Sequence, residues 1–292
     1  MRVHVIGNVA FDETLAVGEW PVPGASILCR MVAGGPGGKG LNQAVALARA
    51  GVDVRLVAGI GEDARGAAIR AALAAEPLVL GLVVMPGRAT DLSIVLSAPD
   101  GDNCNITTTE CAGALGPPEV RTALARAAAG DALLVQGNLS EAATRTALDA
   151  ADARGMVRVM NPSPLRPWQA ALLPDCEAVF LNGAEAEALG GVAALHAAGV
   201  AVVVLTRGAA GALVSGPGGV VEVAAEAVEV RDTTAAGDAF LGAALASALL
   251  RRSAIDAVAL RAGACAAAVA VSRAGALAAL PAREEFAAIM RR

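Results

Sequence analysis

The chain of 292 residues contains no tyrosine, and only 2% of its residues are aromatic. Proteins that bind single-stranded nucleic acid stack the bases on aromatic side chains, so this shortage argues against that class. The formal net charge of −5 argues the same way, because nucleic-acid sites carry a basic surface. We therefore expect no nucleic-acid partner.

Histidine and cysteine are also scarce. His4 and His196 are the only histidines, and neither has a companion at the spacing of a zinc site. The five cysteines are odd in number and include no Cys-x-x-Cys pair, which fits neither a disulfide framework nor a zinc site. These absences exclude zinc hydrolases and nucleophiles activated by histidine, and they predict a reducing, cytoplasmic setting.

Long apolar runs are missing as well. Hydrophobic residues make up 55% of the chain, but no uninterrupted run reaches the ~18 residues that a membrane-spanning helix needs. Even the run Phe240–Leu250 ends at two arginines. We expect no membrane partner, and the length suits one large domain over residues 1–292.

What is present is an alternation of two kinds of segment. Short β-branched runs predict strands at Val3–Ile6, Val54–Ala58, Ala132–Gln136, Val157–Met160, Ala178–Leu181, Ala201–Thr206 and Ala212–Ser215. Alanine-rich runs predict helices at Leu41–Ala50, Ala64–Ala75, Glu119–Ala129, Glu141–Ala153, Ala184–Leu189 and Phe240–Leu250. Such alternation is typical of an α/β fold with a largely parallel sheet, whose ligands lie at the carboxyl ends of the strands.

Two segments interrupt this rhythm. Thr14–Val32 and Ala89–Thr109 contain strand-like pieces and turn residues but no helical pattern. They could pair into a small separate β-layer, covering about residues 13–33 and 88–110. Its natural place is over the ligand site, as a lid.

The stretch from Asp232 to Phe240 predicts a phosphoryl-transfer site. Its small residues, Ala235, Ala236 and Gly237, lead directly into a helix, and the free N–H groups of a helix N-terminus bind anions. Asp238 would stand beside these groups, where it could accept a proton. The alternative is that Asp238 is only a favourable first-turn residue with no chemistry attached.

A second glycine-rich stretch, Gly34–Ala44, also leads into a helix and carries Lys39 and Asn42. Its Gly35-Pro36-Gly37-Gly38-Lys39-Gly40 matches the G-x-G-x-x-G dinucleotide pattern, which leaves a nicotinamide-dependent oxidoreductase as an alternative. The stretch is not a phosphate-binding Walker loop, because alanine and glycine replace two of its required residues.

Together the two stretches resemble the PfkB (ribokinase-like) family of small-molecule kinases. Gly37–Ala44, with Gly59–Asp63 behind it, is similar to the N-terminal signature of that family, and Asp232–Asp238 to the C-terminal one. Asn182-Gly183-Ala184-Glu185 is similar to the family's N-x-x-E motif. The resemblance implies a three-layer α/β/α core with a mostly parallel central sheet and a small β-sheet lid.

It also implies a function for each matching residue. Asp238 would be the base that takes the proton of a sugar hydroxyl as this attacks the γ-phosphoryl of ATP, and Ala235, Ala236 and Gly237 would form the anion hole. The sugar would be held by Asp12, Gly38, Lys39, Asn42, Asn138 and Asp238. ATP would be bound by Asn182, Thr206, Gly208, Gly211 and Gly237.

Two kinds of cation are implied as well. Glu185 would hold Mg²⁺ through water, although Asn182 and Glu185 also have the spacing of a helix capping box. Backbone carbonyls of Asp232, Thr234, Arg273 and Gly275 would bind a monovalent cation, K⁺. Lid strands in this family often pair between subunits, so a homodimer is expected.

The chain departs from the ribokinase pattern at two sugar-binding positions. Ala10 replaces an asparagine, and Asn138 replaces a glutamate. Losing such partners leaves buried hydroxyls unpaired at about 1–3 kcal/mol each. The expected substrate is therefore a sugar or sugar-like polyol other than unmodified ribose. A nucleoside kinase of the same family and a non-catalytic sugar-binding relative stay open as alternatives.

Overall fold

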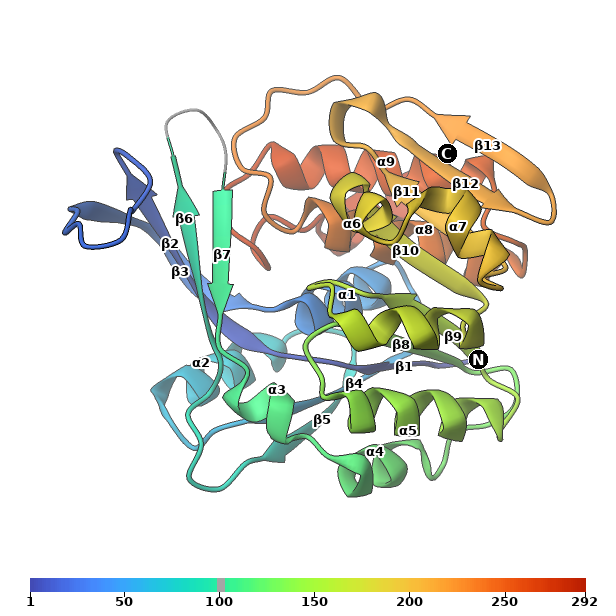
Figure 1. Ribbon diagram of the computed structural model, residues 1–292, viewed down its shortest axis with the longest axis horizontal. Helices are drawn as coiled ribbons and strands as arrows, with labels where there is room; N and C mark the ends of the chain where they lie inside the picture. Colours follow the sequence, from blue (N-terminus) through green and yellow to red (C-terminus); the bar gives the residue numbers. More distant parts are fainter. Residues whose placement is uncertain (99–102) are drawn as a thin grey trace.

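The computed structural model describes residues 1–98 and 103–292, which form two β-sheets and the helices around them (Figure 1). The strands of the large sheet are β1 (Val3–Ile6), β4 (Val54–Ile60), β5 (Val79–Val84), β8 (Ala132–Gln136), β9 (Val157–Asn161), β10 (Ala178–Asn182), β11 (Val203–Thr206), β12 (Ala212–Gly216) and β13 (Gly219–Val223). Within the described residues their order is β13-β12-β11-β10-β9-β8-β1-β4-β5. Neighbours are parallel from β11 to β5, and β12 and β13 are antiparallel additions at one edge. The prediction of a mostly parallel sheet is confirmed.

Helices cover both faces of this sheet, as expected where parallel strands are joined by crossovers. One face carries α1 (Lys39–Arg49), α2 (Ala64–Leu73), α8 (Ala236–Arg251), α9 (Ala257–Val271) and α10 (Arg283–Ile289). The other carries α3 (Glu110–Ala114), α4 (Pro117–Leu124), α5 (Glu141–Asp152), α6 (Gly183–Ala188), α7 (Gly191–Ala197) and the 3₁₀ helix η1 (Pro167–Asp175). Alternating strand residues feed the two cores: Val5 belongs to one and Ile6 to the other. The result is the predicted three-layer α/β/α core.

The small sheet projects from one edge of this core, at the left of Figure 1. It consists of β2 (Ala10–Val17), β3 (Cys29–Gly37), β6 (Leu92–Ser97) and β7 (Asn103–Thr107), in the order β3-β2-β6-β7. Both irregular segments of the sequence contribute to it, so the second β-layer is confirmed. Residues 99–102 of the second segment lie outside the described residues.

The small sheet begins closer to the core than the sequence suggests. β2 starts at Ala10 and β3 runs to Gly37, so Gly34–Gly37 form the end of a strand and not a loop. Gly35–Gly40 therefore does not form the turn after a first buried strand that dinucleotide binding requires. The match to the dinucleotide pattern is fortuitous.

Other differences concern elements without a clear periodic signal. The helix predicted over Glu119–Ala129 ends at Leu124. α9 was not predicted, because alanine occupies so many of its positions that no polar face marks a period. Within the described residues, no helix is both long and apolar enough to cross a membrane.

The parallel sheet brings five polar residues to one edge. Asn8 follows β1, Asn138 follows β8, and Asn161, Asn182 and Thr206 end β9, β10 and β11. Register pairs such as Gln136 with Asn161 and Asn182 with Thr206 align these ends. Because the carboxyl ends of parallel strands share an edge, this edge is where a ligand site is expected.

Candidate active site

The N-terminus of α1 packs directly on the end of β1. The Gly40 N–H donates to Asn8 Oδ1 at 3.2 Å, and a Cβ on Gly40 would lie 2.7 Å from the Asn8 backbone. Gly38, at the N-cap, has φ +96°, and a Cβ on it would lie 2.9 Å from the Ala10 backbone nitrogen. Only glycine allows this approach, which fixes where Lys39 and Asn42 stand.

Asp238, in the first turn of α8, meets α1 in the interior. Its side chain is 4% exposed. Asn42 Nδ2 donates to Asp238 Oδ2 at 3.0 Å, and Gln43 Nε2 donates to Asp238 Oδ1 at 2.8 Å. Hydrogen bonds from N–H donors favour the charged form of a carboxylate. The two signature stretches, about 195 residues apart, therefore meet at one carboxylate.

The backbone before Asp238 is strained. Ala235 is the N-cap of α8 with φ +60°, a left-handed conformation that is uncommon for residues other than glycine. Ala239 N–H is bonded to the Ala235 carbonyl at 2.9 Å, and Ala236 N–H to the Thr233 carbonyl at 3.3 Å. The first N–H groups of a helix have no helical acceptor and can bind an anion, although the predicted anion-hole donor of Ala236 is already bonded within this turn. Strain of this kind clusters at functional sites.

Asp12 of β2 faces the same region from the small sheet. Burial and the negative charge of Asp238 raise the pKa of Asp12 from 3.8 to about 7, and a hydrogen bond from the Gly38 N–H opposes the rise. The two carboxylates are thus close enough for their charges to interact. A hydroxyl placed between them could donate to either oxygen.

Several buried acceptor atoms on the elements that carry the predicted sugar residues have no partner. Within the described residues these include Asp12 Oδ1, Asn42 Oδ1 and Asn138 Oδ1. Buried polar atoms are nearly always hydrogen-bonded in folded proteins, so a group of orphans points to an absent ligand. All three are acceptors, and the ligand that satisfies them must donate. A polyhydroxylated molecule does so.

A cavity of about 500 Å³ lies against α8 and α9. Thr206, Gly208, Gly211 and Gly237 line it, as the sequence predicts for an ATP site. Most of its remaining wall is alanine and valine from α9 and from residues 225–230. The space suits a flat apolar group next to a phosphate chain.

A narrow cavity of about 60 Å³ brings together residues that were predicted to bind the sugar and residues that were predicted to bind ATP. Lys39, Asn182, Glu185, Gly237 and Asp238 all line it. The predicted base, a predicted sugar residue and the predicted phosphate and magnesium residues therefore share one space.

Asn182 and Glu185 also form the capping box that the spacing allowed. The Glu185 N–H donates to Asn182 Oδ1 at 2.8 Å, and the Asn182 N–H donates to Glu185 Oε2 at 2.9 Å. Within the described residues, no group of three histidines, cysteines or acidic residues could hold a metal ion. A single carboxylate with one oxygen left outside the cap fits Mg²⁺, which keeps several of its waters.

The predicted monovalent-cation residues come together on two loops. Asp232 accepts from the Thr234 N–H at 2.8 Å and from the Gly275 N–H at 2.9 Å. Arg273 lies two residues before Gly275 and is paired with Glu285. Thr234 and Gly275 also line a cavity of about 350 Å³ that includes Asp12. The loops thus lie beside the sugar side of the site.

Three residues of the site were missed by sequence reasoning. Gln43 contacts Asp238 directly, while Gln136 and Asn161 contact Gln43. Gln43 lies inside the N-terminal signature, and the other two end buried strands. A polar residue closing an apolar strand is the signal that could have found them.

A buried carboxylate at a helix N-terminus, between a group of orphaned acceptors and a nucleotide-sized cavity, defines a phosphotransferase site. The family model for pfkB family carbohydrate kinases matches residues 2–283.

Relatives of known name agree with this match. A ribokinase of Haemophilus influenzae is 31% identical over 96% of this chain and 95% of its own, and one of Bacillus subtilis is 30% identical over 97% of both. The structure of a ribokinase from Cryptococcus neoformans in complex with ADP superposes with a TM-score of 0.85, at 28% identity, over 98% of this chain and 99% of that one. The chain belongs to the pfkB family and is an ATP-dependent carbohydrate kinase with the ribokinase-like fold.

Proposed function

We propose that this kinase phosphorylates a hydroxyl of a small sugar or sugar-like polyol, with Asp238 as the base. The observation that carries the proposal is the position of Asp238, buried, bonded by two amide donors and at the N-terminus of α8. The carboxylate takes the proton of the attacking hydroxyl. N–H groups of Ala235, Ala236 and Gly237 stabilise the charge on the transferred phosphoryl.

The sugar would lie against Asp12, Gly38, Lys39, Asn42 and Asn138. The orphaned oxygens of three of these residues support this placement, because each can accept one hydroxyl proton. Asn138 replaces a charged acceptor by a neutral amide, and Ala10 supplies no polar group. These two residues favour a sugar other than unmodified ribose.

ATP would occupy the 500 Å³ cavity next to Thr206, Gly208, Gly211 and Gly237, with Asn182 toward its phosphates. Mg²⁺, held through water by Glu185, supplies charge neutralisation of the phosphate oxygens when bound. Lys39 lines the same narrow cavity and adds a fixed positive charge. A K⁺ ion on the carbonyls of Asp232, Thr234, Arg273 and Gly275 would order the loop that leads into α8.

An ADP-release assay over ribose, other pentoses, hexoses, ketoses and nucleosides tests the proposal. At least one sugar should give turnover that Asp238→Asn lowers by at least about 10³-fold while ADP affinity stays within about threefold. Since several relatives are named ribokinase, ribose is the reference substrate. Turnover that survives in Asp238→Asn contradicts the assigned base, and turnover with nucleosides alone contradicts the assigned substrate class.

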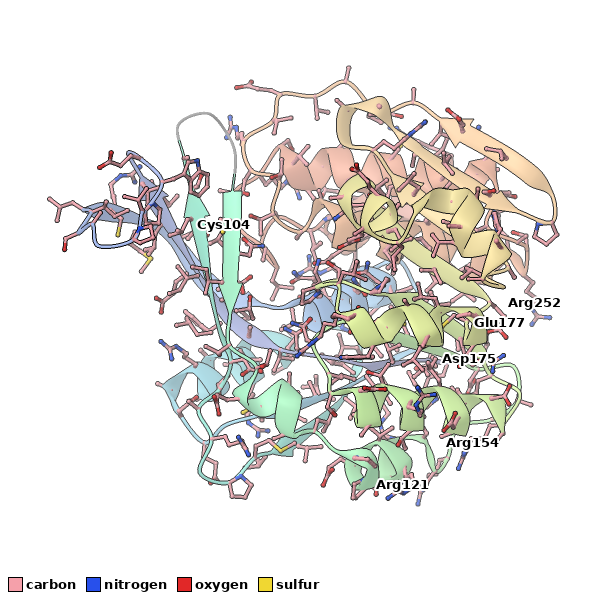
Figure 2. The ribbon with its side chains drawn as sticks, viewed as in Figure 1. Cys104, Arg121, Arg154, Asp175, Glu177 and Arg252 are labelled. Atoms are coloured by element: carbon pink, nitrogen blue, oxygen red, sulfur yellow. The ribbon has the colours of Figure 1, made fainter. Side chains whose placement is uncertain are left out.

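We also propose one cytoplasmic kinase domain over residues 1–292 that pairs as a homodimer through its lid, residues 13–33 and 88–110. Leu28 just before β3, Met31 of β3 and Ile106 of β7 are 97%, 55% and 57% exposed, and Cys104 of β7 is exposed too (Figure 2). Exposed apolar residues at both edge strands of this sheet support pairing with a second subunit there. Light scattering of the purified protein should give the mass of two chains, and Leu28→Asp should give one.

A further inference from the structure

Buried amide side chains form a connected network beneath the Asp238 carboxylate. Gln43 Nε2 donates to Asp238 Oδ1 at 2.8 Å and to Asn161 Oδ1 at 3.0 Å, while Gln43 Oε1 accepts from Gln136 Nε2 at 2.8 Å. Gln43 and Gln136 are both 0% exposed. The three amides come from α1, β8 and β9, so the network ties one helix to the central sheet.

The hydrogen bonds allow one orientation of the Gln43 amide. Asn161 Nδ2 donates to the Phe180 carbonyl at 2.9 Å, which turns the Asn161 oxygen toward Gln43. A flipped Gln43 would place its oxygen against the oxygens of Asn161 and Asp238, and its NH₂ against the NH₂ of Gln136. The flip would therefore lose three hydrogen bonds in a network where, among the described residues, Gln136 Oε1 already has no partner.

We propose that Gln43, fixed by Gln136 and Asn161, is the positioning residue that holds the Asp238 carboxylate in one rotamer through a donor on Oδ1. This inference rests on the proposed role of Asp238 as base. Gln43 occupies a lone pair of Oδ1, and Asn42 occupies one of Oδ2. The remaining lone pairs are directed at the attacking hydroxyl, which is the preorganisation that proton transfer needs.

The charged groups around Asp238 come from other elements. Asp12 of β2 is near enough for the charge of Asp238 to raise its pKa, and Lys39 and Glu185 line the same narrow cavity as Asp238. Gln43 is neutral, so replacing it removes hydrogen-bond donors and leaves all of these charges in place.

The test is Gln43→Met in the full-length enzyme, which keeps the shape of the side chain and removes both donors. We expect kcat to fall by about 10–100-fold, with KM for sugar and for ATP within about threefold. The acid limb of the kcat profile should move to higher pH, because a carboxylate that loses an N–H donor takes up a proton more readily.

Gln169→Met is the matched control. Gln169, in η1, is also 0% exposed; it accepts from the Arg166 N–H and lines none of the cavities described above. The Gln169→Met variant should lower the melting temperature and leave the acid limb of the kcat profile in place. Repeating Gln43→Met in an Asp12→Asn background separates the two carboxylates, since the shift should persist there.

Gln136→Met provides a second variant, because it removes the donor to Gln43 Oε1 and leaves the Gln43 amide itself in place. It should move the acid limb in the same direction by a smaller amount, and it carries the test if Gln43→Met does not fold. A fall in kcat without a shifted limb in a folded variant overturns the positioning role. When Asp238→Asn is inactive and neither glutamine variant shifts the limb, only this inference fails; when Asp238→Asn stays active, the proposed base fails with it.

Discussion

The two ends of the proposed active site differ in polarity: one has buried polar side chains and the other has mostly small apolar residues. At the sugar end, buried polar atoms such as Asp12 Oδ1, Asn42 Oδ1 and Asn138 Oδ1 lack partners among the described residues. At the nucleotide end, the cavity of about 500 Å³ is walled mostly by alanine, glycine and valine. On the proposed assignment, one end would recognise its ligand by fixed hydrogen bonds, and the other by shape and backbone groups.

This difference sets what a substitution should do at each end. A site that hydrogen-bonds its substrate rejects molecules lacking the matching groups far more strongly than an apolar pocket rejects a changed shape. Displacing one polar side chain at the sugar end should therefore cost more than adding a methyl group at the nucleotide end. Pairs of glycines, one crowded and one open, allow this to be tested.

The largest effect is expected from Gly37→Ala. A Cβ there would lie 1.9 Å from Asp12 Oδ2, so the Asp12 carboxylate must leave its place. We expect kcat/KM for the sugar to fall by about 10–100-fold, because misplacing a substrate-binding group by about 1 Å costs that much. The KM for ATP should stay within about twofold in steady-state kinetics.

Gly35→Ala is the control for this variant. Gly35 stands two residues earlier on β3, on the same face of the strand, and a Cβ there meets nothing within 4 Å. It should leave kcat/KM nearly unchanged. Equal losses in both variants would mean that β3 tolerates no side chain at all, and would remove Asp12 from the explanation.

A smaller effect is expected at the nucleotide end from Gly211→Ala. Gly211 has φ +84°, and a Cβ would lie 2.0 Å from the Val223 carbonyl oxygen, so the backbone next to the cavity must move. We expect KM for ATP to rise about tenfold and stability to fall by about 2–3 kcal/mol, with KM for the sugar little changed.

Gly208 lines the same cavity, has φ +57° and meets nothing within 4 Å. Gly208→Ala should cost only the backbone strain of about 1 kcal/mol and raise KM for ATP less than threefold. A larger rise in sugar KM than in ATP KM for Gly211→Ala would show that the two ends are not separable.

The sequence predicted the two ends unequally, for physical reasons. Asp238, Lys39 and Asn42 could be recognised from the sequence because they lie in short stretches where glycines and a helix start form a pattern. Gln136 and Asn161 were not, because they become neighbours only when β8 and β9 pair in parallel. The apolar wall that α9 gives to the nucleotide cavity was not predicted for another reason. Alanine gives no periodic contrast, so neither the helix nor its buried face could be recognised.

The smallest effect concerns how much the Asp12 carboxylate lowers the free energy of unfolding of the ligand-free enzyme. The folded state raises the pKa of Asp12 from 3.8 to about 7, through burial and the charge of Asp238. Between these two values the folded protein binds a proton that the unfolded chain has released, so the free energy of unfolding must fall as pH rises through this window. Above about pH 7 the loss is complete.

Asp12→Asn removes that titration, so it should stabilise the ligand-free enzyme, and by more at pH 8 than at pH 5. We expect the advantage to grow by about 1–2 kcal/mol across this range, less than the full pKa difference corresponds to, because Asp12 is partly exposed and solvent screens it. Urea unfolding of both proteins at pH 5, 6, 7 and 8 measures it. A gap that stays constant with pH would mean that the folded state does not raise the pKa of Asp12. A growing gap would show that the folded, ligand-free enzyme holds the Asp12 carboxylate at a cost in stability, through burial and the nearby charge of Asp238.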